Sequence, residues 1–326
     1  MKKIILGVDG GGTKSQLALF DENGKCINHS ICGTLNHECM TGSYEELEVV
    51  LPEMILNLLR SSRVSISDIT YAVLGIAGAD TIWQHEFISS IISKAGIKDF
   101  KVYNDAFLGV AAGSPNGTGV CAINGTGTSI AALDYSENAF QIGGMGLFTD
   151  DCGGSTWYGE QVIARVYNSL FKMTRPTLLT DMMFEHAGVT DKADFMETII
   201  DKTNNMELFI TDFNRFVFTA AEQGDETALD ILKCSAEHYA GGISYMINNM
   251  DFPIDKPAHI VLAGSVFVKE RVTILPELVE KRIRELVGER SIEFNKIDTV
   301  PVAGAILWAA RRAGIEVDIK TIKEQL

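Results

Sequence analysis

The chain has 326 residues, 46% of which are hydrophobic, and it carries a formal net charge of −15. This negative charge argues against nucleic acid as a partner, because nucleic-acid binding depends largely on lysine and arginine contacts to phosphate. No apolar run reaches the roughly 18 to 20 residues that span a bilayer, and the first residues lack the pattern of a signal peptide, so we expect a cytoplasmic protein that does not bind membranes.

Three short strands are predicted near the start of the chain, at residues 3–8, 14–20 and 25–31. Three consecutive glycines, at positions 10–12, separate the first strand from the second. Glycine costs conformational entropy on folding, so a run of three suggests that the backbone comes close to a ligand there. An ordinary hairpin turn is the alternative, and this turn taken alone leaves both interpretations open.

The same order of elements recurs about 115 residues later. Residues 118–134 again read as a strand, a glycine-rich turn and a strand, which places Asn124–Thr128 over Asp9–Thr13. Each copy continues with an apolar strand that enters a small-residue turn, then a helix, a short strand and a helix of small residues. This internal repeat predicts two α/β lobes, residues 1–114 and 115–326, around a cleft. Residues 155–250 read as a mostly helical insertion in the second lobe.

Two glycine turns that face each other across a cleft can surround the β- and γ-phosphates of a nucleotide with backbone N–H groups. Neither turn contains the lysine motif of a standard P-loop. Thr13, Lys14 and Thr128 are placed to add hydroxyl or cationic contacts. Asp9 follows the first strand into its turn, where it can hold Mg²⁺ through water.

Two further positions carry carboxylates at the ends of apolar segments. Asp105 lies between a short strand and a helix, so it is either a helix cap or the base that phosphoryl transfer to a hydroxyl requires. Asp150 and Asp151 lie among glycines in residues 143–156. Carboxylates there suit hydrogen bonds to sugar hydroxyls, although a solvated turn is the alternative.

Together these segments resemble the phosphate, connecting and adenosine motifs of the actin, heat-shock chaperone and sugar-kinase superfamily. The chain is similar to its N-acetylglucosamine kinase family (the BadF/BadG group). The matching motifs are DGGGTKS at 9–15, Leu35-Asn36-His37, Asn104-Asp105-Ala106, Gly125-Thr126-Gly127-Thr128, GGMG at 143–146 followed by Asp151, and Ala263-Gly264-Ser265. The resemblance implies a duplicated actin-like ATPase fold, which is ribonuclease H-like, with two lobes around a nucleotide cleft. The C-terminal helix could then pack back on the N-terminal lobe.

The resemblance also implies roles for individual residues. Asp105 would take the proton from the 6-hydroxyl of an amino sugar, and ATP with Mg²⁺ would supply the phosphoryl group. The implied sugar contacts are Asn36, Gly144, Met145 and Asp151. The implied ATP contacts are Gly11, Gly12, Thr13, Lys14, Gly125, Thr126, Gly127 and Thr128 at the phosphates, and Gly264 and Ser265 at the adenosine. We expect a homodimer.

Two departures from the family leave the identity of the sugar open. Met145 stands where the family commonly has an aromatic residue, and Cys152 stands where it commonly has a glutamate. N-acetylglucosamine, N-acetylmuramic acid and glucosamine are therefore all candidates.

A rival interpretation is an iron–sulfur ATPase that activates a 2-hydroxyacyl-CoA dehydratase through Cys121 and Cys152. A second rival, a sugar-sensing regulator, would need a DNA-binding module that the sequence does not show.

Overall fold

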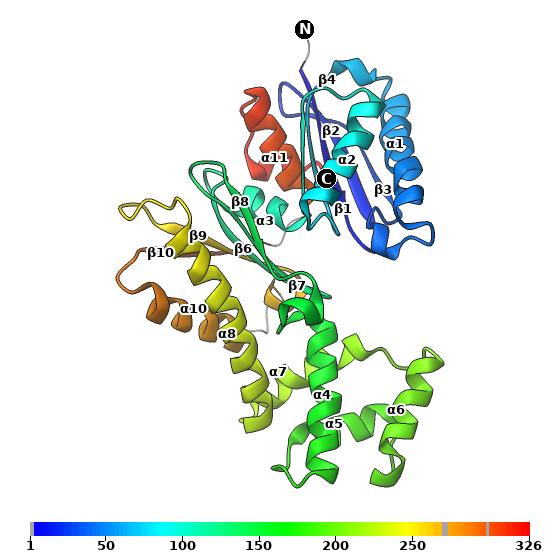
Figure 1. The fold of residues 1–326 in the computed structure, drawn as a ribbon, viewed down its shortest axis with the longest axis vertical. Helices are drawn as coiled ribbons and strands as arrows, with labels where there is room; N and C mark the ends of the chain where they lie inside the picture. Colours follow the sequence, from blue (N-terminus) through cyan, green and yellow to red (C-terminus); the bar gives the residue numbers. More distant parts are fainter. Residues whose placement is uncertain (1–2, 269–272, 298–299) are drawn as a thin grey trace.

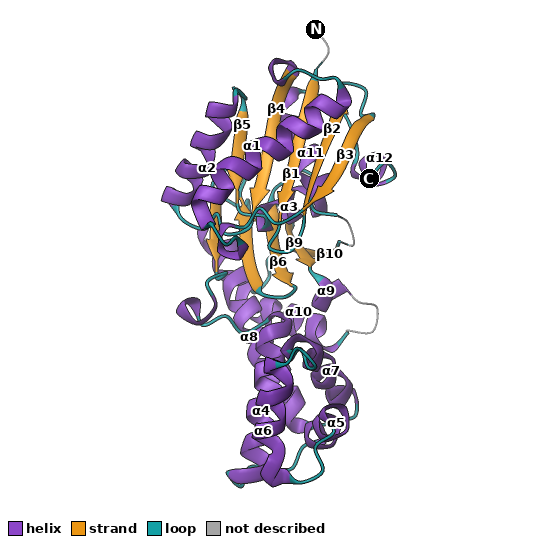
Figure 2. Ribbon diagram, turned by 90° about the vertical axis from the view of Figure 1, so that its right-hand side faces the viewer, coloured by secondary structure: helices purple, strands orange, loops and turns teal. Residues whose placement is uncertain are grey.

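Two α/β lobes are stacked along the long axis of the molecule, and a helical region extends from the second lobe (Figure 1). The structure is a computed structural model that describes residues 3–268, 273–297 and 300–326. Each lobe is built on a mixed sheet of five strands. The end of the chain returns to the first lobe, where the chain also begins (Figures 1 and 2).

The first sheet has the strand order β3-β2-β1-β4-β5. Its strands are β1 (Ile4–Gly10), β2 (Ser15–Asp21), β3 (Cys26–Cys32), β4 (Ile69–Ile76) and β5 (Phe100–Tyr103). β1 and β2 pair antiparallel, as do β2 and β3, whereas β1, β4 and β5 run parallel. Helices α1 (Ser43–Ser62) and α2 (Ile82–Ala95) cross one face of this sheet (Figure 2). All parallel strands of the first lobe therefore end at one edge.

The second sheet repeats this arrangement, with the order β8-β7-β6-β9-β10. Its strands are β6 (Gly119–Asn124), β7 (Thr128–Leu133), β8 (Ala139–Ile142), β9 (Ala258–Ala263) and β10 (Ile292–Lys296). β6 pairs antiparallel with β7 and parallel with β9, just as β1 pairs with β2 and β4. Helices α8 (Glu226–Asn249) and α10 (Ile274–Val287) share a core with one face of this sheet. The repeat predicted from the sequence is thus present in the strand pairing.

Two helices lie between the sheets. α3 (Ala106–Gly113) follows the first sheet but packs against β6 and β7, while α11 (Val302–Ala313) follows the second sheet and packs against β1 and β4. The two helices also pack against each other; all of α3 and residues 302–310 of α11 are buried. Each lobe therefore contributes a helix to the core of the other. The division of the chain at residue 114 stays a prediction.

The helical region lies between β8 and β9 in the sequence. It comprises α4 (Gly154–Phe171), α5 (Leu178–Ala187), α6 (Phe195–Asn204), α7 (Asn214–Glu222) and α8. The remaining helices are short: α9 (Ser265–Val268), α12 (Ile319–Lys323), and the 3-10 turns η1 (His37–Cys39), η2 (Ile66–Asp68), η3 (Gly146–Thr149), η4 (Lys192–Asp194) and η5 (Ile210–Phe213). Among the described helices, none is both long and apolar enough to cross a bilayer.

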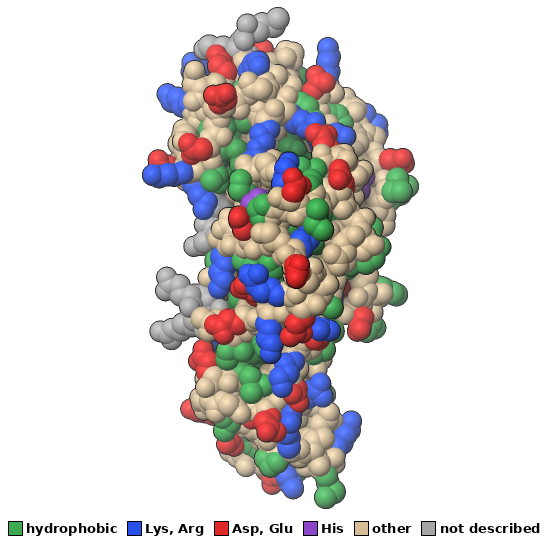
Figure 3. All heavy atoms as spheres, turned by 90° about the vertical axis from the view of Figure 1, so that its left-hand side faces the viewer, with side chains coloured by type: hydrophobic (Ala, Val, Ile, Leu, Met, Phe, Trp, Pro, Cys, Tyr) green, Lys and Arg blue, Asp and Glu red, His purple; other side chains and the backbone are tan. Residues whose placement is uncertain are grey.

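Acidic and basic side chains are mixed over the face of the molecule drawn in Figure 3. Within the residues that the structure describes, that face shows no extended basic surface of the kind that nucleic acid requires (Figure 3).

Candidate active site between the two lobes

Three aspartates meet at the carboxyl edge of the first sheet. β1, β4 and β5 are parallel neighbours, so their carboxyl ends lie side by side. Asp9 is the second-last residue of β1, Asp80 follows the turn after β4, and Asp105 lies between β5 and α3. The side-chain oxygen of Asn104, the residue before Asp105, accepts a 2.9 Å hydrogen bond from the N–H of Ala106 at the start of α3. Asn104 thus shares the start of this helix with Asp105, which stands at the N-cap position and whose carboxylate also has hydrogen-bond contacts with the N–H groups of Ala106 and of Asp105 itself. The role of Asp105, as helix cap or as base, stays a prediction.

The carboxylates at this edge hold their protons more tightly than usual. Burial raises the pKa of Asp105 to about 6, and the negative charge of Asp80 adds to the rise. Burial also raises the pKa of Asp9 to about 7; the charge of Asp105 adds to it and Lys14 opposes it. A carboxylate whose pKa lies near 6 is well suited to accept a proton close to neutral pH. Neighbouring carboxylates with perturbed pKa values are typical of functional sites.

Asp80 is the member of this group that sequence reasoning missed. Its Oδ1 atom accepts hydrogen bonds from Asn104 Nδ2 at 2.9 Å and from Gln141 Nε2 at 2.8 Å. Gln141 belongs to β8 of the second lobe, so this carboxylate joins the two lobes at the candidate site. The signal that could have found it was present: β4 is a third apolar strand that enters a turn with a glycine, Gly78, and then a carboxylate.

The first glycine turn is shaped by close packing. A Cβ atom at Gly10 would lie 2.6 Å from Ile76 Cδ1, and one at Gly11 would lie 2.7 Å from the carbonyl oxygen of Lys14. Thr13 and Lys14 are exposed at the tip of the turn. A Cβ atom at Gly12 would lie 3.2 Å from Cys39 Sγ, a looser contact than those at Gly10 and Gly11. Local packing accounts for two of the three glycines, and the exposed tip is the part that can meet a phosphate.

The second glycine turn has open space around it. A Cβ atom at Gly125 or Gly127 would meet no atom within 4 Å among the described residues. Thr126 between them is exposed. Packing does not explain these two glycines, whereas close approach of a ligand to the backbone would. This turn is therefore the stronger of the two phosphate candidates on structural grounds.

Helices α4 and α8 hold the second turn in place through hydrogen bonds. The N–H groups of Ser155 and Thr156, in the first turn of α4, donate to the carbonyls of Gly125 and Thr126 at 2.8 and 3.2 Å. The hydroxyl of Thr128 donates to the Tyr239 hydroxyl of α8 at 2.6 Å, in the buried interior. The Thr128 side chain is thus engaged in the core. Any phosphate contact by Thr128 would come from its backbone.

The adenosine candidates lie beside the second turn. Gly264 has φ +89°, and a Cβ atom there would lie 2.5 Å from the carbonyl oxygen of Asn124, at the end of β6. Only glycine combines this backbone conformation with so close a contact. Ser265 begins α9 and is exposed.

The loop at residues 143–151 folds around the carboxylate of Asp151. Oδ2 of Asp151 accepts hydrogen bonds from the N–H groups of Gly144 and Gly146, both at 2.9 Å, and Oδ1 accepts one from the Thr149 hydroxyl. Met145 is half exposed. Asp151 therefore shapes this loop in the structure, and a sugar would have to share or replace the bonds that the loop makes.

Asn36 lies between the first glycine turn and the turn that carries Asp80. Its Oδ1 accepts a 2.9 Å hydrogen bond from the N–H of Glu38, which caps η1. A Cβ atom at Gly78, whose φ is +80°, would lie only 2.6 Å from the same Oδ1 atom. The predicted sugar residue Asn36 is thus held close to Asp80, although its own side chain is partly used by η1.

The chain matches the BadF/BadG/BcrA/BcrD ATPase family over residues 6–309. It belongs to this family. An N-acetyl-D-glucosamine kinase of Dictyostelium discoideum is 25% identical over 94% of this chain and 98% of that protein. An N-acetylmuramic acid/N-acetylglucosamine kinase of Clostridium acetobutylicum is 24% identical over 81% of this chain and 85% of that protein. A ROK hexokinase structure from Thermus thermophilus superposes with a TM-score of 0.58, at 15% identity, over 96% of this chain and 99% of that chain.

The family and the fold inferred from the motifs are therefore confirmed: this is a duplicated actin-like ATPase of the BadF/BadG group. The nucleotide of the family is ATP, as its description as an ATPase family states. The individual site residues stay predictions. The structure places Asp105 and the loop at 143–151 beside Asp80, Asp9 near Asp105, and Gly264 against the strand that leads to the second turn.

The cysteines do not favour an iron–sulfur site. Cys121 is fully buried in β6, and a Cβ atom at Gly109 of α3 would lie 2.4 Å from its sulfur. Cys152 contacts Cys234 rather than Cys121, and burial raises the pKa of the Cys152 thiol to about 12. Within the described ranges, no three cysteine, histidine or acidic side chains lie together as a metal site made of protein ligands alone.

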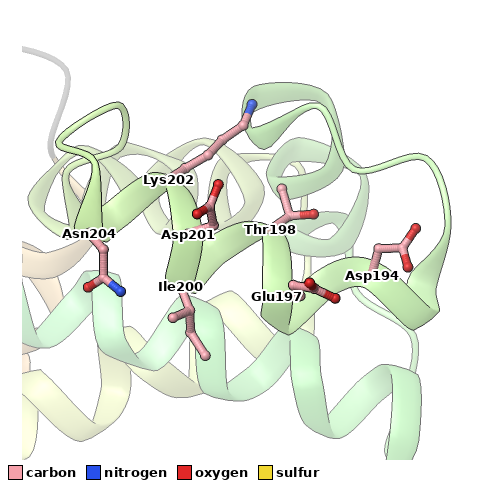
Figure 4. Close-up of a pocket in the computed structure, with 7 residues that line it drawn as sticks. All are labelled: Asp194, Glu197, Thr198, Ile200, Asp201, Lys202 and Asn204. Carbon is pink, nitrogen blue, oxygen red and sulfur yellow. The ribbon is translucent and has the colours of Figure 1, made fainter.

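A surface hollow of about 860 Å³ lies along α6, away from the candidate site (Figure 4). Its lining residues are Asp194, Glu197, Thr198, Ile200, Asp201, Lys202 and Asn204. α6 lies at the end of the helical region farthest from the first lobe (Figure 1). Neither glycine turn nor any of the three aspartates lines this hollow, so it is separate from the candidate active site.

Proposed function

We propose that this protein is an ATP-dependent kinase that phosphorylates the 6-hydroxyl of an amino sugar. The observation that carries the proposal is the position of Asp105. Its carboxylate lies at the carboxyl edge of the first sheet, close to Asp80, which in turn contacts the second lobe through Gln141. N-acetylglucosamine is the first candidate, and N-acetylmuramic acid and glucosamine are the others. The two relatives named above act on the first two of these sugars according to their names.

In the proposed reaction, the Asp105 carboxylate accepts the proton of the sugar 6-hydroxyl. The sugar oxygen forms a bond to the γ-phosphorus of ATP while the bond from that phosphorus to the β,γ-bridging oxygen breaks, and ADP leaves. Positioning and charge neutralisation provide most of the catalysis in phosphoryl transfer. The exposed backbone of residues 125–127 would hold the phosphates, and the loop at 143–151 would orient the sugar.

The carboxylates also fit a divalent cation. Asp9 and Asp105 are both partly buried, and the charge of Asp105 raises the pKa of Asp9. A cation beside Asp9 would relieve this repulsion, and Asp9 would hold it through water. Mg²⁺, when bound, would neutralise charge on the β- and γ-phosphates.

The proposal also includes a cytoplasmic location and a homodimer. Light scattering of the purified protein tests the dimer.

The test is to incubate the purified protein with ATP, Mg²⁺ and each of the three sugars and to measure ADP. We expect ADP with at least one sugar and a phosphate on its 6-oxygen, seen by phosphorus and proton NMR. If none of the three sugars yields ADP above the level without sugar, the proposed function is wrong. A phosphate on another oxygen would retain the kinase but overturn the assigned position.

A further inference from the structure

The two oxygens of the Asp80 carboxylate have different surroundings. Oδ1 accepts hydrogen bonds from the side-chain amides of Asn104 and Gln141. Oδ2 has no hydrogen-bond partner among residues 3–268, 273–297 and 300–326. The side chain is only partly buried, so this oxygen is accessible as an acceptor. One half of the carboxylate is held rigidly and the other half is available to a ligand.

The Asp80 carboxylate lies beside the loop that forms the candidate sugar site. A Cβ atom at Gly144 would lie 3.8 Å from Asp80 Oδ1 and 2.9 Å from Gln141 Nε2, so the backbone of the loop at 143–151 passes directly by Asp80. Asn104, the residue before Asp105, donates a hydrogen bond to Asp80. A sugar whose 6-hydroxyl reaches Asp105 and whose ring lies along this loop would therefore contact Asp80.

Two acidic groups, Glu38 and Asp105, act on Asp80 or are acted on by it. Burial raises the pKa of Asp80, and the charge of Glu38 adds to the rise. The hydrogen bond from Gln141 and the charges of His37 and His85 oppose it. After burial, the charge of Asp80 is the next cause that raises the pKa of Asp105. His37 is buried, and burial lowers its pKa, which keeps it neutral near pH 7. Such a site favours hydroxyl, amide N–H and ammonium donors, and it repels a carboxylate because like charges oppose each other at close range.

We propose that Asp80 determines the specificity of the sugar site: its Oδ2 atom accepts a hydrogen bond from a hydroxyl or N–H group of the sugar, and its charge selects neutral amino sugars over those that carry a carboxylate. This inference rests on the proposed function. It ranks N-acetylglucosamine and glucosamine, which lack a carboxylate, above N-acetylmuramic acid, which has one. We expect the wild-type kcat/KM to be at least about tenfold higher for N-acetylglucosamine than for N-acetylmuramic acid.

Asp80→Asn tests the role of the charge. The amide oxygen can still accept the hydrogen bonds from Asn104 and Gln141, but the second oxygen becomes a donor and the charge is lost. We expect KM for N-acetylglucosamine to rise about tenfold or more, as is typical when a charged hydrogen bond is removed, with a smaller change in kcat. The preference for N-acetylglucosamine over N-acetylmuramic acid should fall by about tenfold.

Two further variants separate charge from structure. Glu53→Gln removes the same charge from an exposed position on α1 and should leave the preference unchanged. Gln141→Ala removes the link between the lobes but keeps the carboxylate, so it should lower kcat/KM for both sugars without changing their ratio. A ratio that falls as much in Gln141→Ala as in Asp80→Asn would overturn the assignment to charge.

The wild-type measurement keeps the inference testable even if Asp80→Asn does not fold. A wild-type enzyme that uses N-acetylmuramic acid as well as N-acetylglucosamine contradicts the inference about Asp80 while leaving the kinase in place. The same holds for a folded Asp80→Asn variant with an unchanged ratio. Absence of ADP with every sugar would instead overturn the proposed function, and the inference with it.

Discussion

The chemistry proposed for Asp105 follows from where its carboxylate lies. Partial burial and the nearby charge of Asp80 both make the protonated form more favourable than in water. Asn104 also accepts a hydrogen bond from the N–H of Ala106 at the start of α3. A carboxylate that is kept partly away from solvent and has a raised pKa is suited to proton transfer, and the Asp105→Asn variant tests this role against that of a helix cap.

Asp105→Asn should lower kcat by about 10²–10⁴-fold, the usual contribution of a general base. The amide keeps the shape of the side chain but cannot accept the hydroxyl proton. KM for the sugar should change much less, because contacts from the loop at 143–151 remain. Steady-state kinetics measure both constants, and a thermal melt confirms that the variant is folded. A variant with near wild-type kcat would show that Asp105 has no role as the base.

The pH dependence of the wild-type enzyme should report the same group. With a pKa of about 6, Asp105 is largely protonated and inactive below that pH and ionised above it. We expect kcat/KM to rise between pH 5 and pH 7 and to fall about tenfold for each pH unit below the midpoint. The residual kcat/KM of Asp105→Asn should not show this rise between pH 5 and pH 7. A profile that is flat from pH 5 to pH 8 would disagree with the assignment.

At the scale of elements, the second glycine turn depends on helices that are distant in sequence. The Tyr239 hydroxyl of α8 accepts a hydrogen bond from Thr128 and donates one to the carbonyl of Ile123 at 3.0 Å. Asn124 Oδ1 accepts a 2.8 Å hydrogen bond from the N–H of Gly154 in α4. The turn is therefore fixed at both ends by the helical region. This gives the insertion a role in positioning the proposed phosphate site.

Tyr239→Phe should destabilise the protein by about 1–3 kcal/mol, since two buried partners lose their hydrogen bonds. It should also raise KM for ATP more than KM for the sugar, because the turn it supports is the proposed phosphate site. Tyr245→Phe is the matched control: Tyr245 lies on the same helix and is half exposed. Denaturant melts and kinetics with each substrate varied in turn measure these effects. Equal increases in both KM values would argue against a specific role for the turn.

The sequence predicted local features well and contacts between distant segments poorly. The repeat, the two glycine turns and Asp105 were all visible as strands that end in glycine or carboxylate. Asp80 has a local signal in the turn after β4, but its hydrogen bond from Gln141, 61 residues away, was missed because the two residues meet only when the lobes assemble. The engagement of Thr128 by Tyr239, 111 residues away, was missed for the same reason. Patterns within a segment do not encode such pairings.

At the scale of the whole molecule, α3 and α11 make the two lobes depend on each other. Each helix follows one sheet and packs on the other, and the two helices touch closely. A Cβ atom at Gly304 of α11 would lie 2.1 Å from the carbonyl oxygen of Leu108 in α3. The helices can approach this closely only because residue 304 has no side chain. If the lobes move relative to each other, they must therefore keep this contact or rotate about it.

Gly304→Ala should destabilise the protein by about 1–3 kcal/mol through overpacking, because the obstructing atom is backbone and cannot rotate away. Gly241→Ala is the control: Gly241 lies on α8, is exposed, and a Cβ atom there meets nothing within 4 Å among the described residues. That change should be neutral or stabilise by about 0.5–1 kcal/mol, since alanine favours a helix more than glycine does. Because the affected contact joins both lobes, Gly304→Ala should shift unfolding as one transition. Circular dichroism and the combined fluorescence of Trp83, Trp157 and Trp308 follow it. Separate transitions for the two probes, or a Gly304→Ala variant as stable as Gly241→Ala, would show that the lobes do not depend on this contact.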